Sequence, residues 1–176
     1  MGTNCVLRSR KSKKYHHFQN IDLNTTTVDY GFRLNGYCIQ DNEEVIEHVN
    51  ENYDKTRTYE QVKEIFIKLL RSQFGTAIGA KYLKQLVYDI EELQLFLQEK
   101  GRAKILGSSL FFTFARDYYE QAEIFDNKLH IVRVKLIDLC HVEHLEDLDD
   151  KDDGFLKGTF ELLRLLNEIQ CEFYLN

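Results

Sequence analysis

The feature that most constrains the fold is a long amphipathic helical pattern that begins at residue 58. Thr58 and Gln61 have the spacing of a capping box, in which the hydroxyl and the amide satisfy the first free N–H groups of a helix. Apolar residues then recur at helical spacing to about Gln73, and again from Ile78 until Gly101. We therefore predict two consecutive scaffold helices. Their inward residues are Val62, Ile65, Phe66, Leu69 and Leu70, followed by Leu83, Leu86, Val87, Ile90, Leu93 and Leu97.

Strands and one further helix are predicted around this scaffold. Residues 32–39 alternate loosely around two glycines, which predicts a bent strand. Residues 105–115 predict a buried strand, and 129–139 alternate more clearly; a turn at Asp126-Asn127 would pair them antiparallel. Gly154 introduces a last helix. The order predicts an α+β fold, with mostly antiparallel strands and packed helices, in one domain over residues 1–176. Inward residues of the last helix are Phe155, Leu156, Leu163, Leu166 and Ile169.

Charge and cysteine usage narrow the class of protein. The formal net charge is -6, which argues against a general nucleic-acid binder. The four cysteines are scattered and no apolar run is long enough to span a membrane, so we expect a reduced chain in the cytoplasm, the nucleus or both. The sequence defines no oligomeric state.

A basic segment interrupts this acidic background near the N-terminus. Five cations and no acid lie between residues 8 and 14. Such a cluster suits the binding of several phosphates, but it also suits a solvated tail, a nuclear-localisation signal or a nucleic-acid patch. The residues alone leave these functions open. The cations are Arg8, Arg10, Lys11, Lys13 and Lys14.

Asp138 is the most informative single residue, because it follows an otherwise apolar strand. The alternation places it on the same face as Val132, Val134 and Leu136. Burial of a carboxylate is costly unless a cation or hydrogen-bond donors neutralise it. Kinases use an aspartate in such a position to hold magnesium against the nucleotide phosphates. A strand-end aspartate that caps a turn is the structural alternative.

Two other motifs can carry chemistry. Gly107-Ser108-Ser109 interrupts the other predicted strand, either as a β-bulge or as a step where hydroxyl groups approach a phosphate or a metal-bound water. His141 follows Asp138 by three residues, and its imidazole could donate to an anion or accept a proton near neutral pH. An exposed histidine with no such role is the alternative.

Together these blocks resemble the inositol polyphosphate kinase family, in order and at similar spacing. A Thr run followed by residues 31–36 resembles the family's Gly-Phe-Arg-Ile-x-Gly step, and Lys55-Thr56-Arg57 resembles Lys-x-Gly-Arg. Residues 107–110 match Gly-Ser-Ser-Leu, and 134–141 resemble the block that ends in Ile-Asp-Phe-Ala-His. Residues 153–158 resemble Asp-Glu-Gly-Tyr-x-x-Gly. The resemblance covers residues 25 to 160, and no single block in it is specific.

The resemblance implies transfer of the ATP γ-phosphate to a hydroxyl group of an inositol phosphate, with Mg²⁺ as the cofactor metal. Asp138 would then bind the metal, and Ser108 and Ser109 would line the side of the nucleotide phosphates. His141 would sit beside the reacting hydroxyl. The basic segment, within residues 1–28, would bind the inositol polyphosphate, and residues 29–176 would form the core of the kinase domain.

One part of the family pattern is missing from the sequence. The family carries a Pro…Asp-x-Lys-x-Gly segment, and Met1-Gly2-Thr3 resembles only the end of it. We therefore expect an incomplete version of the kinase fold, from a shortened form of a longer protein, with little activity alone. A catalytically inactive remnant that binds inositol phosphates is the alternative. An interaction protein with a basic arm for nucleic acid is a third reading, which explains neither Gly107-Ser108-Ser109 nor Asp138.

Overall fold

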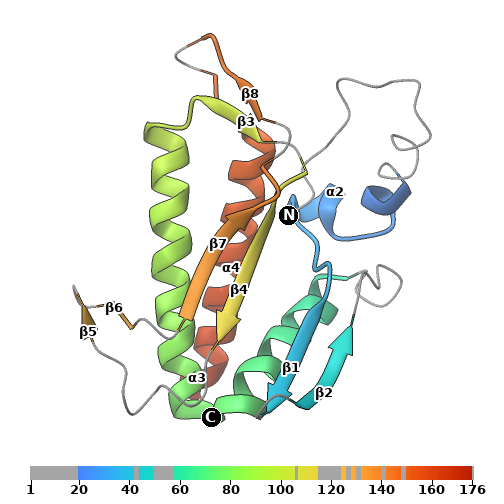
Figure 1. Ribbon diagram of the computed structural model, residues 1–176, viewed down its shortest axis with the longest axis vertical. Helices are drawn as coiled ribbons and strands as arrows, with labels where there is room; N and C mark the ends of the chain where they lie inside the picture. The colour runs from blue at the N-terminus through green and yellow to red at the C-terminus, as the bar shows by residue number, and fades with distance from the viewer. Residues whose placement is uncertain are drawn as a thin grey trace.

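Two packed helices form the centre of the computed structural model. Helix α3 (Tyr59–Glu99) and helix α4 (Asp153–Leu175) run side by side, and the antiparallel strands β4 (Ser109–Phe114) and β7 (Val132–Ile137) lie over them (Figure 1). Their facing residues are almost fully excluded from solvent, as apolar residues at helical spacing require. The structure describes residues 20–41, 44–49, 58–105, 107–114, 124–125, 128–129, 132–139, 142–147 and 150–175. Buried members of the core include Val62, Leu70, Leu83, Leu86, Ile90, Phe155, Leu165, Leu166 and Ile169.

The two predicted scaffold helices are the arms of one helix of 41 residues. Figure 1 shows that α3 changes direction sharply between these arms. A Cβ atom built on Gly79 would lie 3.0 Å from the carbonyl oxygen of Leu70. Residues nine apart in a straight helix are about 13.5 Å apart along the axis, so the chain must fold back between them. The prediction of a break was wrong in detail, because the backbone stays helical through the bend.

The predicted start of α3 is confirmed. The Thr58 hydroxyl accepts a hydrogen bond from the Gln61 backbone N–H at 3.1 Å, and the Gln61 side-chain oxygen accepts one from the Thr58 N–H at 3.1 Å. Each bond satisfies an N–H group that would otherwise lack an intrahelical partner. The predicted start of the last helix is also confirmed, since α4 begins at Asp153, one residue before Gly154.

The first strand is shorter than the sequence predicted. Strand β1 (Tyr37–Asp41) pairs antiparallel with β2 (Glu44–Val49), and the second of these strands was not predicted. Residues 32–36 lie outside the ladder, and the Phe32 carbonyl accepts a hydrogen bond from the Thr26 hydroxyl instead. The loose alternation of residues 32–36 therefore does not indicate a strand, because these residues form an irregular segment that leads into β1.

The predicted antiparallel pair is confirmed. Strands β4 (Ser109–Phe114) and β7 (Val132–Ile137) pair with Phe112 opposite Val134. Alternate residues of β4 face the helices, and the ring of Phe112 meets the ring of Phe66 edge to face, with 5.8 Å between the centroids. This layer of strands on helices is the α+β arrangement predicted from the element order.

Two short strands extend this antiparallel pair after an interruption. Strand β3 (Ala103–Ile105) pairs with β8 (Val142–His144), and the short strands β5 (Ile124–Phe125) and β6 (Lys128–Leu129) pair with each other. The residues between β5 and β6, where a turn was predicted, lie outside the described part of the chain. The β3–β8 ladder ends with Ile105 opposite Val142, and the β4–β7 ladder has Ser109 opposite Ile137 at its end.

The N-terminal part of the described chain packs against α4. Helix α2 (Thr27–Tyr30) ends at Gly31, whose φ of 71° lies in the left-handed region. A Cβ atom on Gly31 would lie 2.7 Å from the backbone nitrogen of Gly158, so only glycine permits this close approach. Over the described residues, no helix has the length and hydropathy needed to cross a bilayer.

Candidate functional site

A cavity of about 570 Å³ lies between β1, β4 and the first arm of α3. Its apolar wall includes Phe66 of α3 and Phe112 of β4. Its polar residues include Asn35, Ser109 and Asp138, which come from three separate parts of the sequence. The cavity thus joins three of the sequence blocks that resemble the kinase family.

Asp138 lies at the end of β7 in an unusual backbone conformation. Its φ is 60°, and it is the one residue other than glycine with a positive φ in the described part of the chain. A left-handed residue costs about 1–3 kcal/mol, and such residues concentrate at functional sites. The conformation also ends the alternation of the strand. Asp138 is therefore exposed, and the prediction that it shares the buried face of Val132 and Leu136 was wrong.

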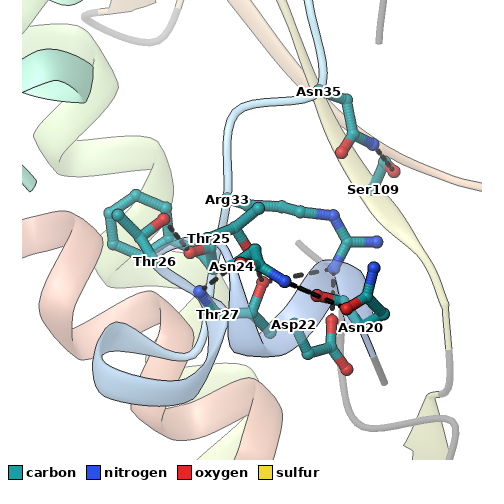
Figure 2. A network of polar contacts seen from close by, with 10 residues as sticks. Asn20, Asp22, Asn24, Thr25, Thr26, Thr27, Arg33, Asn35 and Ser109 are labelled. Carbon is teal, nitrogen blue, oxygen red and sulfur yellow. Dashed lines mark hydrogen bonds and ion pairs between the residues drawn. The ribbon is translucent and has the colours of Figure 1, made fainter. Parts of the chain in front are cut away.

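The two serines of the Gly107-Ser108-Ser109 step have different environments. Ser109 lines the cavity, and its hydroxyl accepts a hydrogen bond from the Asn35 side-chain amide at 3.5 Å (Figure 2). Ser108 is fully buried and does not line the cavity, and its hydroxyl has no hydrogen-bond partner among the described residues. Of the two, only Ser109 is placed where it can contact a ligand in the cavity.

The interrupted ladder brings the serine step and the aspartate together. Ser109 is paired with Ile137, the residue immediately before Asp138. Gly107 also has a left-handed φ, of 70°, so both strands leave regular geometry at the same level. Departures of this kind from a regular ladder commonly redirect side chains next to functional sites.

A buried polar network beside the cavity was not recognised as functional from the sequence. The Arg33 guanidinium donates to the Asp22 carboxylate at 2.7 Å and to the Thr27 hydroxyl at 3.2 Å (Figure 2). Burial raises the pKa of Asp22 above its usual value, although the charge and the hydrogen bond of Arg33 act in the opposite direction. Arg33 also lines the cavity. The sequence signal that could have identified this network is the charged residue Arg33 within the Gly-Phe-Arg step.

We call the part of the cavity lined by Asn35, Ser109 and Asp138 its polar end. This polar end suits a hard cation that also binds phosphate. Asp138 offers a carboxylate, Ser109 a hydroxyl and Asn35 an amide, all of them groups with oxygen donors. Within the described ranges, no three His, Cys, Asp or Glu side chains gather as a complete metal site. A single carboxylate fits Mg²⁺, which is commonly bound by one or two carboxylates together with substrate phosphates.

Several predicted site residues cannot be placed relative to this cavity. His141 and the basic segment lie outside the described residues. The segment comprises Arg8, Arg10, Lys11, Lys13 and Lys14. The Lys55-Thr56-Arg57 block also lies outside them. Their roles in substrate binding and catalysis stay predictions.

Comparisons with known proteins identify the family. The family model described as inositol polyphosphate kinase matches residues 1–167. The fold is similar to that of the inositol phosphate multikinase Ipk2 from S. cerevisiae, solved in complex with ADP and Mn²⁺. The TM-score is 0.76 at 18% identity, over 95% of this chain and 75% of that chain. A second inositol phosphate multikinase structure matches with a TM-score of 0.68 and 18% identity, over 96% of this chain and 76% of that one. No curated protein sequence matches. Because the family model covers most of its length, the chain belongs to the inositol polyphosphate kinase family.

Proposed function

We propose that the chain is an ATP-dependent kinase that transfers the γ-phosphate to a hydroxyl group of an inositol phosphate, with a low rate when it acts alone. Membership of the family supports the reaction class. The observation that carries the proposal is the single cavity that combines Asp138, Ser109 and the segment 33–36. Phosphoryl transfer depends mainly on positioning and on neutralisation of charge, so a small set of polar groups beside an apolar wall suits it.

Asp138 would hold the divalent metal together with oxygen atoms of the nucleotide phosphates. The similar yeast multikinase binds ADP and Mn²⁺, which supports the same type of ligand here, and we expect Mg²⁺ to serve in this chain. The bound metal would neutralise the charge that develops on the phosphates. Asp138 is exposed and lines the cavity, which supports this role.

The other residues of the chain would bind and orient the substrates. Ser109 would donate its hydroxyl proton to a phosphate oxygen, and the hydrogen bond that its oxygen accepts from Asn35 supports this orientation. The apolar wall around Phe66 and Phe112 would exclude water from one side of the cavity. We propose that His141 approaches the reacting hydroxyl and that the basic segment binds the remaining phosphates.

The test is an assay of phosphate transfer from ATP to inositol 1,4,5-trisphosphate, with Asp138→Asn as the variant. Asparagine removes the charge but tolerates the left-handed conformation, so the fold should be preserved. We expect the rate to fall by about a hundred- to a thousand-fold, as commonly follows the loss of one charge-stabilising group. Asp29→Asn is the matched control, because Asp29 is an exposed acid of α2 that does not line the cavity. An Asp138→Asn variant with full activity would refute the metal assignment.

Binding without turnover would favour the alternative function. A catalytically inactive member of the family should still bind inositol hexakisphosphate at low salt, and the affinity should fall steeply as salt is added. If the wild-type chain neither transfers phosphate nor binds this polyphosphate at low salt, both functions are excluded.

A further inference from the structure

We propose that Asn35 is a further ligand of the divalent metal, and that its side-chain oxygen binds the ion together with the carboxylate of Asp138. This inference rests on the proposed function and adds a residue to its metal site. The family resemblance assigns no role to Asn35, because this residue occupies the position that the Gly-Phe-Arg-Ile-x-Gly step leaves undefined.

The side chain of Asn35 carries an oxygen atom that nothing in the described part of the chain satisfies. Its amide nitrogen donates to the Ser109 hydroxyl at 3.5 Å, whereas its Oδ1 atom is shielded from solvent and has no hydrogen-bond partner among the described residues (Figure 2). A buried acceptor of this kind is destabilising, because it has lost its hydrogen bonds to water. A ligand that reaches Oδ1 from the cavity would therefore relieve a cost that the ligand-free protein already carries.

The groups around this oxygen favour a cation over a phosphate group. Asn35 lines the polar end of the cavity together with Ser109 and Asp138. The Oδ1 atom of Asn35 and the carboxylate of Asp138 are both acceptors, and phosphate oxygens, which are acceptors too, would be repelled by them in the absence of a positive charge. A divalent ion removes this repulsion. Carboxylate and amide oxygens are also the ligands that such hard ions prefer.

The segment that carries Asn35 is held in place from two sides. Arg33, two residues before Asn35, is paired with the buried Asp22 carboxylate at 2.7 Å. The bond to Ser109 joins Asn35 to β4, and β4 pairs with the strand β7 that ends immediately before Asp138. A ligand atom on a segment that is already fixed loses little conformational entropy when it binds the ion.

The experiment measures the affinity of the chain for Mn²⁺ in the presence of saturating ADP. The electron paramagnetic resonance signal of the free ion, which weakens as the ion binds, provides the readout. Asn35→Leu removes the oxygen from a side chain of similar size and should weaken Mn²⁺ binding about ten-fold, as the loss of one group from a metal site commonly does. Asn35→Asp replaces a neutral oxygen by a charged one and should tighten Mn²⁺ binding about ten-fold, because the affinity of such sites rises with the charge of their ligands.

Gln40→Leu and Gln40→Glu are the matched controls. Gln40 is an exposed residue of β1 that lines the same cavity and does not belong to its polar end. The two substitutions repeat the loss of an amide and the gain of a negative charge at a second point of the cavity wall. Both variants should bind Mn²⁺ with the affinity of the wild type. If Gln40→Glu tightens binding as much as Asn35→Asp does, the added charge alone explains the effect and the proposed ligand is overturned.

The results separate this inference from the proposed function. If both Asn35 variants bind Mn²⁺ like the wild type while Asp138→Asn loses the ion, the role of Asn35 is overturned and the metal role of Asp138 stands. Weaker binding in Asn35→Asp also overturns it, because this result indicates that the amide nitrogen donates to a phosphate. A wild-type chain that binds no Mn²⁺ with ADP overturns both. Asn35→Asp keeps the shape of the side chain, so its result decides the question if Asn35→Leu does not fold.

Discussion

The helical scaffold and the polar segment of residues 20–35 both contain buried side chains, but different forces hold them in place. The scaffold, formed by α3 and α4, buries apolar side chains such as Leu165, Leu166 and Ile169 with no measurable exposure. The polar segment buries Asp22 and Arg33 instead, and these depend on directed bonds to one another. Apolar packing is non-directional and tolerates substitutions that conserve volume, whereas a buried ion pair fails when one partner is lost.

The difference also separates the apolar packing of the fold from the residues that we propose to act in the candidate site. The scaffold supplies part of the apolar wall of the cavity, through residues such as Phe66, but none of its polar residues Asn35, Ser109 and Asp138. The polar segment and the ends of β4 and β7 carry the charges, the left-handed residues and the serine step. Sites of this kind commonly contain strained or desolvated groups that the rest of the fold must stabilise.

The largest stability effect should come from the scaffold. Phe155 is fully buried at the start of α4, and Phe155→Ala should lower the free energy of unfolding by about 3–5 kcal/mol, because it leaves a cavity in the core. Urea unfolding measures this change. Phe160→Ala on the same helix is the control, since Phe160 is 60% exposed and its loss should cost less than about 0.5 kcal/mol. Equal losses in the two variants would contradict the role assigned to the scaffold.

A smaller effect is expected where the polar segment meets the scaffold. Gly31→Ala places a side chain at a φ of 71° and 2.7 Å from the backbone of Gly158. The conformation should cost about 1–2 kcal/mol, and displacement of the neighbouring backbone should add about 1–3 kcal/mol. Thermal unfolding measures the sum. Gly36→Ala is the control, because Gly36 is exposed and has no positive φ. A Gly31→Ala variant as stable as this control would show that α2 can move away from α4.

Sequence periodicity predicted the scaffold well because burial alone determines it. The spacing of apolar residues identified both arms of α3 and the inward face of α4, and the capping box located Thr58 as the helix start. The bend in α3 was predicted as a break, since periodicity cannot show whether helical hydrogen bonds continue through a change of direction. The antiparallel pairing of β4 with β7 was predictable for the same reason, because buried apolar residues recur along these strands, and the structure confirms it.

The candidate site was only partly predictable because it depends on backbone geometry and on long-range partners. Alternation placed Asp138 on the buried face, and only its φ of 60° explains why it is exposed. The two serines look equivalent in the sequence, yet one lines the cavity and the other is buried. The partnership of Asp22 with Arg33 could not be deduced either, since neither residue follows a periodic pattern that points to the other.

The smallest predicted effect concerns a polar contact inside the scaffold itself. Tyr59 is 8% exposed, its hydroxyl donates to Glu168 of α4 at 3.1 Å, and its ring lies 4.8 Å from the ring of Tyr30. Burial, with the neighbouring Glu168 carboxylate, raises the pKa of Tyr59 to about 12 from an ordinary value of 10.0. The neutral phenol is therefore favoured in the folded state, and its contribution to stability is complete below about pH 10.

That contribution should disappear as the pH rises through about 12, the folded-state pKa of Tyr59. The measurement is a titration of tyrosinate absorbance in the wild type and in Tyr59→Phe, whose difference isolates one of the ten tyrosines. The difference should titrate near pH 12, and the stability of the two proteins should converge above it. A difference that titrates near pH 10 would show that Tyr59 is open to water. The junction of α2 with the scaffold would then be looser than the packing of Tyr59 between Tyr30 and Glu168 indicates.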